Sequence, residues 1–236
     1  MNWDQVVSRV SPHLFKIETP QGHGTGFILH YNSNLCCVAT AEHVIDHADN
    51  WKQPIKLVHH ETGEHIFLKE DDRVIYRDGD KDSAVILFLK PNFKLPEVPV
   101  ALLPEGNLID IGSEIGWLGF PSVAPYTACF FSGNVSARQE FRKAYLIDGV
   151  AINGVSGGPV LYLDPTEGVQ IVGAVSAYAA NRATGEALPG LAIAQDVTHF
   201  HGVVSHVNSI QEASQKKAEI EHNKSSNADG ENAAGS

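Results

Sequence analysis

The sequence predicts an all-β protein, and three observations lead to that fold class. Short runs rich in β-branched and aromatic residues recur from Leu14 to Asp196. Gly, Pro, Asn or Asp bounds several of these runs, and no long stretch of helical periodicity interrupts them before residue 205. Strands that are this short and this frequent are typical of barrels or sandwiches, whereas strand–helix–strand units need helical segments between the strands.

Eleven runs have the composition and the bounding residues of strands. They are Leu14–Glu18, Gly26–His30, Cys36–Thr40, Ile55–His59, His65–Leu68, Ala84–Leu89, Glu114–Gly119, Ala144–Ile147, Pro159–Leu163, Ile171–Ser176 and Leu191–Ala194.

Between the sixth and seventh runs, Lys90–Gly106 carries four prolines and a glycine. We expect it to connect two β subdomains of one domain over residues 1–207, at about 10–100 and about 105–200.

Both ends of the chain differ from this pattern. Residues 1–10 are expected to form a short amphipathic helix or a lead-in segment. Asn208–Lys224 is rich in Gln, Glu and Lys, which favour helix. Residues 225–236 lack any large apolar side chain, so a disordered tail is expected there.

Charge and hydropathy exclude two classes of partner. The formal net charge is −11, and the chain has no cluster of basic residues beyond Lys216–Lys217, so nucleic acid is not an expected partner. The apolar runs are well short of the roughly 20 residues that a membrane helix needs. Residues 1–10 include Asp4 and Arg9 and hold no continuous apolar segment, so no secretory signal is expected either.

The three cysteines point to a reducing compartment. Cys36 and Cys37 are adjacent and would face opposite sides of a strand, so they are poorly placed to bridge one another. With Cys129 the count is odd. We therefore expect a cytoplasmic protein in which all three behave as small buried apolar side chains.

The segment Gly154–Pro159, Gly-Val-Ser-Gly-Gly-Pro, is the strongest sign of chemistry. A serine hydroxyl needs a base to take its proton and donors for the developing oxyanion. Glycines around Ser156 permit backbone angles that turn two N–H groups toward one point. The candidate donors are the N–H groups of Gly154 and Ser156.

Two other interpretations of this segment exist. A glycine-rich turn can carry a serine for structural reasons alone. The residues also match the G-x-S-x-G motif of α/β-hydrolases, which requires a helix directly after the serine. Here Pro159 and the strand-like run Val160–Leu163 follow, which argues against that motif.

A base and its orienting acid are expected upstream if the chain order is His, Asp, Ser. His43 lies just past the apolar run Cys36–Thr40, which would hold the ring rigidly and leave it accessible. The chain has twelve histidines, and only this placement singles out His43. Asp82 heads the apolar run Ser83–Leu89, where a partly buried carboxylate needs a partner such as a histidine N–H. The neighbouring aspartates are better interpreted as solvated loop charges: Asp71, Asp72, Asp78 and Asp80.

Four segments in this order resemble the trypsin-like serine peptidases, and in particular their bacterial high-temperature-requirement (Deg) branch. They are Gly22–Ile28 (GHGTGFI), Thr40–Ile45 (TAEHVI), Asp82–Ile86 (DSAVI) and Gly154–Pro159 (GVSGGP). Further matching landmarks are Gly112–Pro121, Ser132–Ala137, Ala151–Asn153 and Gly190–Ala194. The resemblance implies two perpendicular six-stranded antiparallel barrels with a His43–Asp82–Ser156 triad between them, an oxyanion hole at Gly154 and Ser156, and no cofactor.

The chain departs from the Deg pattern in two ways. Ala151–Asn153 is followed directly by Gly154, which makes this loop one residue shorter than usual. No peptide-binding PDZ domain is expected, so the oligomer that such proteins form is in doubt. The expected C-terminal helix could dock a partner protein in place of the missing domain.

The resemblance also implies a substrate preference and a mode of activation. Val150 would lie at the base of the S1 pocket, and the strand of Ser176, Ala177 and Tyr178 would pair with the substrate backbone. No acid is present there, so we expect cleavage after small or medium apolar residues. Val155 stands where activated zymogens carry an aspartate, so the uncleaved chain is expected to be competent or to be switched by loop ordering.

Two loose groups of histidines were considered as metal ligands. His59, His60 and His65 lie near Glu61 and Glu64 without the spacing of a known motif, and His199, His201 and His206 are equally loose. Solvated surface is the expected environment of both groups, and no metal is expected.

Two function classes follow from these residues. The first is a serine endopeptidase that acts on a peptide or an unfolded protein through an acyl-enzyme. The second is a peptide-binding or sensing module on a protease fold with little turnover, since fold alone does not establish function. The complete triad favours the enzyme.

Overall fold

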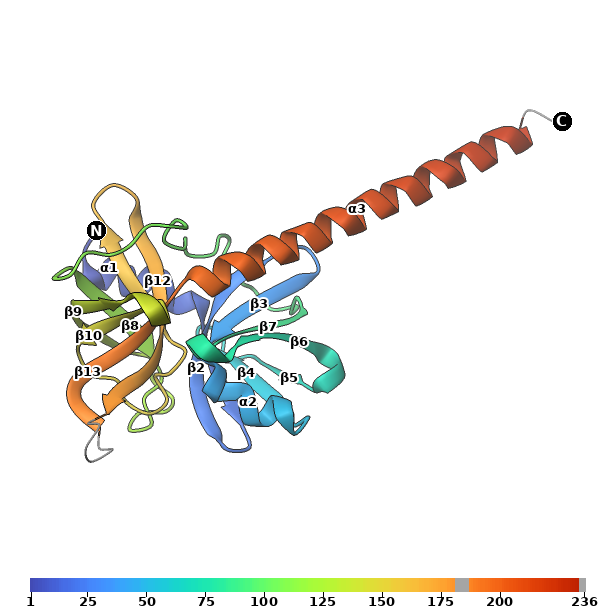
Figure 1. Ribbon diagram of the computed structural model, residues 1–236. Helices are drawn as coiled ribbons and strands as arrows, with labels where there is room; N and C mark the ends of the chain where they lie inside the picture. The colour runs from blue at the N-terminus through green and yellow to red at the C-terminus, as the bar shows by residue number, and fades with distance from the viewer. Residues whose placement is uncertain (181–186, 234–236) are drawn as a thin grey trace. The chain divides into compact units, whose positions relative to one another are not determined.

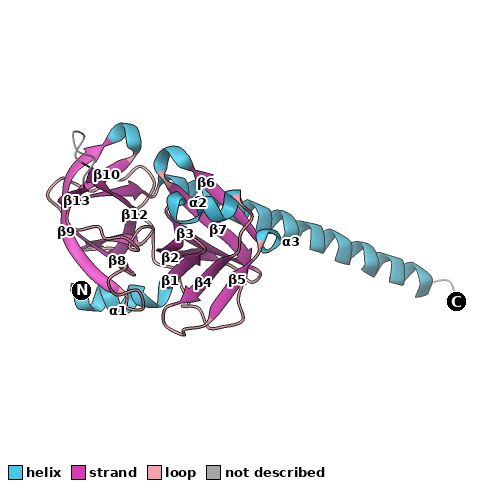
Figure 2. Cartoon of the chain, turned by 90° about the horizontal axis from the view of Figure 1, so that it is seen from below, coloured by secondary structure: helices cyan, strands magenta, loops and turns pink. Residues whose placement is uncertain are grey.

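The structure is a computed structural model. It describes the backbone of residues 1–180 and 187–233, with the side chains of residues 1–176, 190–213 and 215–216. Met1–His201 forms one compact unit, and Gly202–Ser236 forms a second. Within the first unit, two antiparallel β bodies lie side by side (Figures 1 and 2). The predicted all-β fold is confirmed.

The first β body is a sheet of seven strands in the order β5-β4-β1-β2-β3-β7-β6. Its strands are β1 Leu14–Thr19, β2 Gly22–Tyr31, β3 Leu35–Thr40, β4 Ile55–His59, β5 His65–Leu68, β6 Arg73–Asp78 and β7 Ser83–Leu89. The expected count of six was therefore wrong for this half, because β6 was not predicted and pairs with β7 along its whole length.

Arg73, the first residue of β6, joins the two edges of this sheet. Its Nη1 donates to the carbonyl oxygens of Leu68, at the end of β5, and of Gln53, both at 2.9 Å. A buried guanidinium thus links the two edges where no strand pairing does. The core of this body consists of fully buried side chains, among them Phe15, Ile28 and Val38.

The second β body is a closed six-stranded barrel in the order β10-β13-β12-β11-β8-β9, as expected. Its strands are β8 Glu114–Gly119, β9 Cys129–Gln139, β10 Ala144–Asp148, β11 Pro159–Asp164, β12 Gly168–Ala180 and β13 Ala187–Asp196. Trp117 and Tyr145 are its largest buried side chains.

In the part of the chain that the structure describes, three α-helices accompany the strands: α1 Trp3–Val10, α2 Glu42–Asn50 and α3 Thr198–Ala233. In α1, Asn2 and Gln5 form a reciprocal capping box, which explains why the helix begins at Trp3. The Trp3 indole donates to Glu114 at 2.8 Å and lies 5.3 Å from the Phe130 ring, so α1 is attached to β8 and β9.

α3 begins ten residues earlier than the predicted start at Asn208. Asp196 Oδ1 accepts the Thr198 N–H at 3.0 Å, which satisfies one of the backbone donors that have no partner within the helix at its start. The helical backbone also continues through residues 225–233, where a disordered tail was expected; residues 234–236 lie outside the described part. None of the helices in the described part combines the length and apolar character that a membrane crossing requires.

Candidate active site

The end of β3 positions His43. The strand ends at Thr40, Ala41 keeps an extended backbone, and His43 is the second residue of α2. The sequence placed His43 just past an apolar run without predicting a helix, and the structure has α2 there. The imidazole extends from the first turn of this helix, and the His43 side chain remains 48% exposed.

A short 3-10 helix over Gly79–Lys81 leads to Asp82. Asp82 has left-handed backbone angles, φ 45° and ψ 48°, which aspartate tolerates better than most residues. The next residue, Ser83, is buried and bonds the His199 ring at 2.8 Å. Asp82 is thus fixed from its C-terminal side by the first strand residue of β7.

The structure brings His43 and Asp82 together as expected. His43 Nδ1 lies 2.8 Å from Asp82 Oδ2 and 3.0 Å from Oδ1, and the His43 backbone N–H donates to Oδ1 at 2.9 Å. A carboxylate only accepts hydrogen bonds, so Nδ1 carries the proton of the neutral ring. Nε2 is then free of a proton and can act as a base.

Ser176 adds a third contact to this pair. Its hydroxyl donates to Asp82 Oδ2 at 2.5 Å. The sequence predicted a substrate-binding role for Ser176 and missed this contact, because the two residues are 94 positions apart. Only knowledge of the barrel packing could have indicated it.

These contacts shift both pKa values in the directions that favour an ion pair. The hydrogen bond to Asp82 raises the pKa of His43 above 6.5, against the opposing effect of burial. Burial acts to raise the pKa of Asp82, but its hydrogen bonds with His43 and Ser176 outweigh it and lower that pKa below 3.8. Asp82 is therefore ionised at any pH at which His43 titrates.

Ser156 lies in the same pocket as His43. The pocket has a volume of about 250 Å³, and His43, Asn153, Gly154 and Ser156 contribute to its wall. Within the described part of the chain, the Ser156 hydroxyl bonds the Ser176 carbonyl, at 3.5 Å, and not His43. Long or unformed contacts between nucleophile and base are common before substrate binds.

The N–H groups of Gly154 and Ser156 are held free for an acceptor. The Asn153 carbonyl accepts the Ser122 N–H at 2.7 Å, and the Val155 carbonyl accepts the Gly158 N–H at 2.9 Å. In a trans peptide the N–H points opposite to the carbonyl, and no cis peptide occurs. Neither the Gly154 N–H nor the Ser156 N–H donates to an acceptor among the described residues.

Glycine is required at two positions of this loop. Gly154 has φ +93°, and a Cβ there would lie 2.3 Å from the Phe120 carbonyl oxygen. Gly157 has φ +82°, and its Cβ would lie 2.2 Å from the carbonyl oxygen of Thr25. Any side chain at either position would therefore displace the Ser156 loop.

One known protein family matches the part of the chain that holds these residues. Residues 24–173 match the family described as "Trypsin-like peptidase domain", which is more than half of the chain. The chain belongs to this trypsin-like family. No curated protein sequence matches it.

Solved structures of serine proteases share this trypsin-like fold. The Rv3671c protease from M. tuberculosis, in an inactive form, has a TM-score of 0.61 at 19% identity, covering 85% of this chain and 91% of that one. The serine endoprotease from Yersinia pestis has a TM-score of 0.62 at 18% identity, covering 87% of this chain and 66% of that one. At such identities the likeness concerns the fold.

Four residues of the trypsin-like chain were expected to bind substrate, and the structure describes the side chains of only two of them, Val150 and Ser176. Val150 is 49% exposed in the loop after β10 and does not line the pocket of His43 and Ser156. Ala177 and Tyr178 lie on β12, paired with Ile193 and Ala192 of β13, and their side chains are outside the described ones. The pocket wall instead includes Thr19, Gln21 and His23 from the β1–β2 turn, which the sequence did not single out.

The histidines that were considered as metal ligands have other partners. His59 is fully buried, bonds Thr62 and the Pro12 carbonyl, and stacks on Phe93 at 5.2 Å, so the expectation of a solvated side chain was wrong. His201 Nε2 donates to the Leu103 carbonyl at 2.8 Å. No group of three potential metal ligands occurs among the described residues.

The cysteines of the trypsin-like chain are free thiols. Cys36 and Cys37 are both buried, and burial raises the pKa of each, for Cys37 to about 12. A thiol with so high a pKa is a poor nucleophile at neutral pH, which fits the expected role of these two as small buried apolar groups. Cys129, the first residue of β9, is only half-buried, so the expectation was wrong for it.

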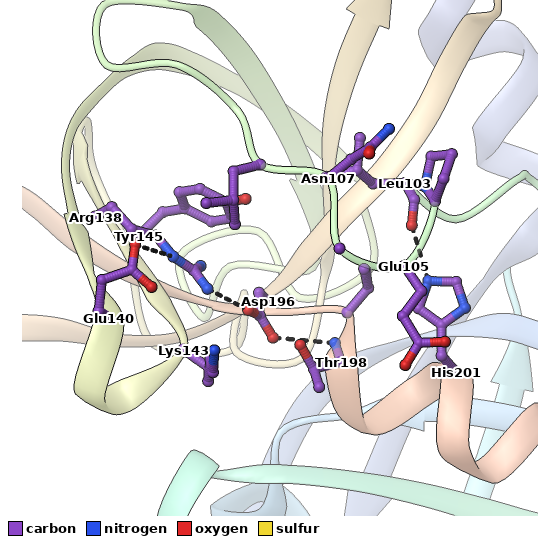
Figure 3. Close-up of a pocket in the computed structure, with 14 residues that line it drawn as sticks. Leu103, Glu105, Asn107, Arg138, Glu140, Lys143, Tyr145, Asp196, Thr198 and His201 are labelled. Atoms are coloured by element: carbon purple, nitrogen blue, oxygen red, sulfur yellow. Dashed lines mark hydrogen bonds and ion pairs between the residues drawn. The ribbon is translucent and has the colours of Figure 1, made fainter.

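A second pocket lies beside the start of α3 (Figure 3). Arg138 pairs with Asp196 at 2.5 Å and lies over the Tyr145 ring at 4.6 Å, and Asp196 also caps Thr198. The central charges of this pocket are thus paired with one another, and we assign no ligand to it.

Proposed function

We propose that this trypsin-like chain is a serine endopeptidase that hydrolyses peptide bonds through an acyl-enzyme. One observation carries the proposal. His43, which Asp82 holds through its ring Nδ1, lines one pocket with Gly154 and Ser156, and the N–H groups of Gly154 and Ser156 have no acceptor among the described residues. A pocket with a nucleophile, an oriented base and two free donors has the groups that acyl transfer needs.

The mechanism assigns one role to each group. His43 Nε2 takes the Ser156 proton as Oγ attacks the scissile carbonyl, and the Gly154 and Ser156 N–H groups receive the oxyanion. Asp82 holds the ring tautomer and stabilises the imidazolium. His43 then protonates the leaving amine, and water repeats the cycle to release the acid. Each step uses side chains or backbone N–H groups of this chain together with one water molecule, and no cofactor is required.

The substrate class of the proposal is a peptide or an unfolded protein cut after a small or medium apolar residue. Val150, Ser176, Ala177 and Tyr178 are proposed to form the S1 side, where the absence of an acidic residue disfavours Lys and Arg. The finer assignments, to the Deg branch and to the cytoplasm, are part of the same proposal. A partner protein on the C-terminal helix is proposed as the means of substrate recruitment.

Labelling with a fluorophosphonate probe tests the proposal. Ser156 is expected to be the only strongly labelled residue, and Ser156→Ala is expected to abolish both labelling and casein cleavage without changing the circular dichroism spectrum. Ser136→Ala, a matched change at an exposed serine on β9, should behave as wild type. Persistent cleavage by Ser156→Ala would refute the triad, and probe binding without turnover would favour the sensing module.

A peptide-library profile tests the specificity separately. The expected profile is dominated by Val, Ala and Leu on the acyl side of the cleaved bond. A profile dominated by Lys or Arg would contradict the proposed S1 side while leaving the triad intact.

A further inference from the structure

Thr25 lies on β2 in the first β body and makes four hydrogen bonds, although it is fully buried. Its N–H donates to the Ser156 carbonyl at 2.8 Å, and its carbonyl accepts the Thr40 hydroxyl at 2.7 Å. Its own hydroxyl donates to the Gly154 carbonyl at 2.8 Å and accepts the Phe120 N–H at 3.0 Å. Every polar group of Thr25 is therefore used.

These four bonds join three parts of the chain. Thr40 ends β3, which leads to His43, and Phe120 follows β8 of the second barrel. Gly154 and Ser156 both line the pocket of His43, and their N–H groups have no acceptor among the described residues. One residue thus connects the base-bearing sheet, the second barrel and the loop of the nucleophile, and its side chain makes the bonds to Gly154 and Phe120.

A second residue of β2 supports the same loop. His23 Nε2 donates to the Phe120 carbonyl at 3.0 Å, and a Cβ on Gly154 would lie 2.6 Å from that nitrogen. Gly154 therefore packs between the His23 ring and the Phe120 backbone. The His23 contact limits movement of Gly154 in one direction, and the Thr25 hydroxyl fixes its carbonyl in another.

We propose that Thr25 is a positioning residue that holds Gly154 and Ser156 in the geometry that accepts the oxyanion, an inference that rests on the proposed function. The hydroxyl matters more than the shape of the side chain. Without it, the buried Phe120 N–H and Gly154 carbonyl both lose their partner, and the loop must move to satisfy them. Misplacement of a catalytic group by about 1 Å costs on the order of 100-fold in rate.

Two substitutions distinguish the effect of the Thr25 hydroxyl from the effect of its side-chain shape. Thr25→Val keeps the shape and removes the hydroxyl, whereas Thr25→Ser keeps the hydroxyl and removes the methyl group. We expect Thr25→Val to lower kcat by about 10- to 100-fold with KM within about twofold, and Thr25→Ser to stay within about fivefold of wild type. Thr166→Val, the same change in the exposed β11–β12 turn, should behave as wild type. The pH at which activity falls should not move in any of these variants, because the His43–Asp82 contacts are untouched.

Inhibitor affinity distinguishes a positioning role from a merely structural one. A merely structural role would not weaken the binding of a tetrahedral adduct more than the binding of a product peptide. A peptidyl-valine boronic acid forms a tetrahedral adduct on Ser156, and its affinity should weaken in Thr25→Val by the same factor as kcat. The affinity of the matching product peptide should stay unchanged. A folded Thr25→Val with kcat within twofold of wild type, or with both affinities weakened equally, would overturn the proposal.

A third variant covers the case in which Thr25→Val does not fold. Thr25→Cys keeps a weaker donor of similar size. A tenfold fall of kcat at unchanged KM supports the proposal, and a kcat within twofold of wild type overturns it. Failure of the proposed function is distinguishable, because it would appear in the wild-type chain as absence of labelling and cleavage.

Discussion

The Asp82 carboxylate accepts hydrogen bonds from two parts of the chain that are distant in sequence. His43 donates to it from the ring and from the backbone, and Ser176 donates from its hydroxyl. Hydrogen bonds to a carboxylate favour its ionised form, and an ionised Asp82 favours the protonated form of His43. The pH at which His43 gains its proton, and with it the working pH range, therefore depends on Asp82.

Activity should fall with decreasing pH while the protein stays folded. The base is lost as pH falls through the pKa of His43, which lies above 6.5. A raised histidine pKa stabilises the fold at low pH, and that contribution is lost only as pH rises through the raised value. The contribution of Asp82, whose pKa is lowered below 3.8, is fully present above that value and is lost as pH falls through the lowered pKa.

We therefore expect kcat/KM at about pH 5 to be nearly zero while this pair still stabilises the fold. Cleavage rate and thermal melting measured on the same samples check this. Unfolding that coincides with the activity loss would contradict the assignment of that loss to His43.

Removing the Asp82 charge should change both rate and pH profile. Asp82→Asn is expected to lower kcat by about 10⁴-fold, since an amide can hold the imidazole in the wrong tautomer. It should also shift the acidic limb of the profile to lower pH, because the cause of the raised His43 pKa is gone. Ser176→Ala keeps the charge and should lose far less. An unchanged acidic limb in Asp82→Asn would contradict the role of Asp82.

At the residue scale, the sequence predicted what is local and missed what is distant. His43, Asp82 and Ser156 could be proposed as a triad because His43 follows an apolar run, Asp82 precedes one and Ser156 lies in a glycine-rich turn. Thr25 lies in a matching segment, but its partner Gly154 is 129 positions away. Contacts of that kind come from the packing of two barrels, which no local pattern contains.

At the element scale, the missed strands are those with little alternation of buried and exposed residues. β9 has one buried position in eleven, and β6 is an edge strand with one in six. Backbone pairing with neighbouring strands holds them in place, and the sequence of one strand does not reveal its neighbours. α2 was missed because nine residues with two buried side chains carry too little helical periodicity.

The close pairing of β9 with β10 makes a glycine on β9 critical. A Cβ on Gly133 would lie 1.9 Å from the Asp148 carbonyl oxygen, so the strands would have to separate. We expect Gly133→Ala to cost about 3 kcal/mol and to lower Tm by about 6–12 °C.

Gly202→Ala is the matched control for this change. A Cβ on Gly202, in α3, meets no atom within 4 Å, and alanine favours helix, so its Tm should be equal or higher. Equal melting temperatures of Gly133→Ala and wild type would contradict the closeness of β9 to β10.

At the scale of the whole molecule, helix α1 is packed against the second barrel with Met1 still attached. Trp3 anchors α1 to Glu114 and Phe130. Val155 is fully buried and offers no carboxylate to a new N-terminal amine. We expect the chain with Met1 attached to react with the fluorophosphonate, as checked by intact mass spectrometry of the labelled protein. Labelling confined to an N-terminally shortened form would contradict this.

The first turn of α3 belongs to the compact unit of the two barrels, whereas residues from Gly202 onward form a separate unit. Phe200 is fully buried and meets the Phe27 ring edge-on at 5.8 Å, and His199 bonds Ser83, the neighbour of Asp82. A chain that ends at Val197 loses both contacts. Removing a buried aromatic side chain costs about 3–5 kcal/mol, so this form should melt well below full length or fail to fold.

Chains that end at Lys224 or at Val207 keep this first turn, and both should remain folded in a thermal melt. We expect the chain ending at Val207 to cleave casein as fast as full length, because all groups proposed for catalysis lie before Gly202. Equal rates on casein would leave the removed helix as either a recruitment element or an inert one. A loss of casein cleavage in a folded form would instead make the helix part of the active-site switch. That result would contradict the expectation that the residues before Gly202 are sufficient for catalysis.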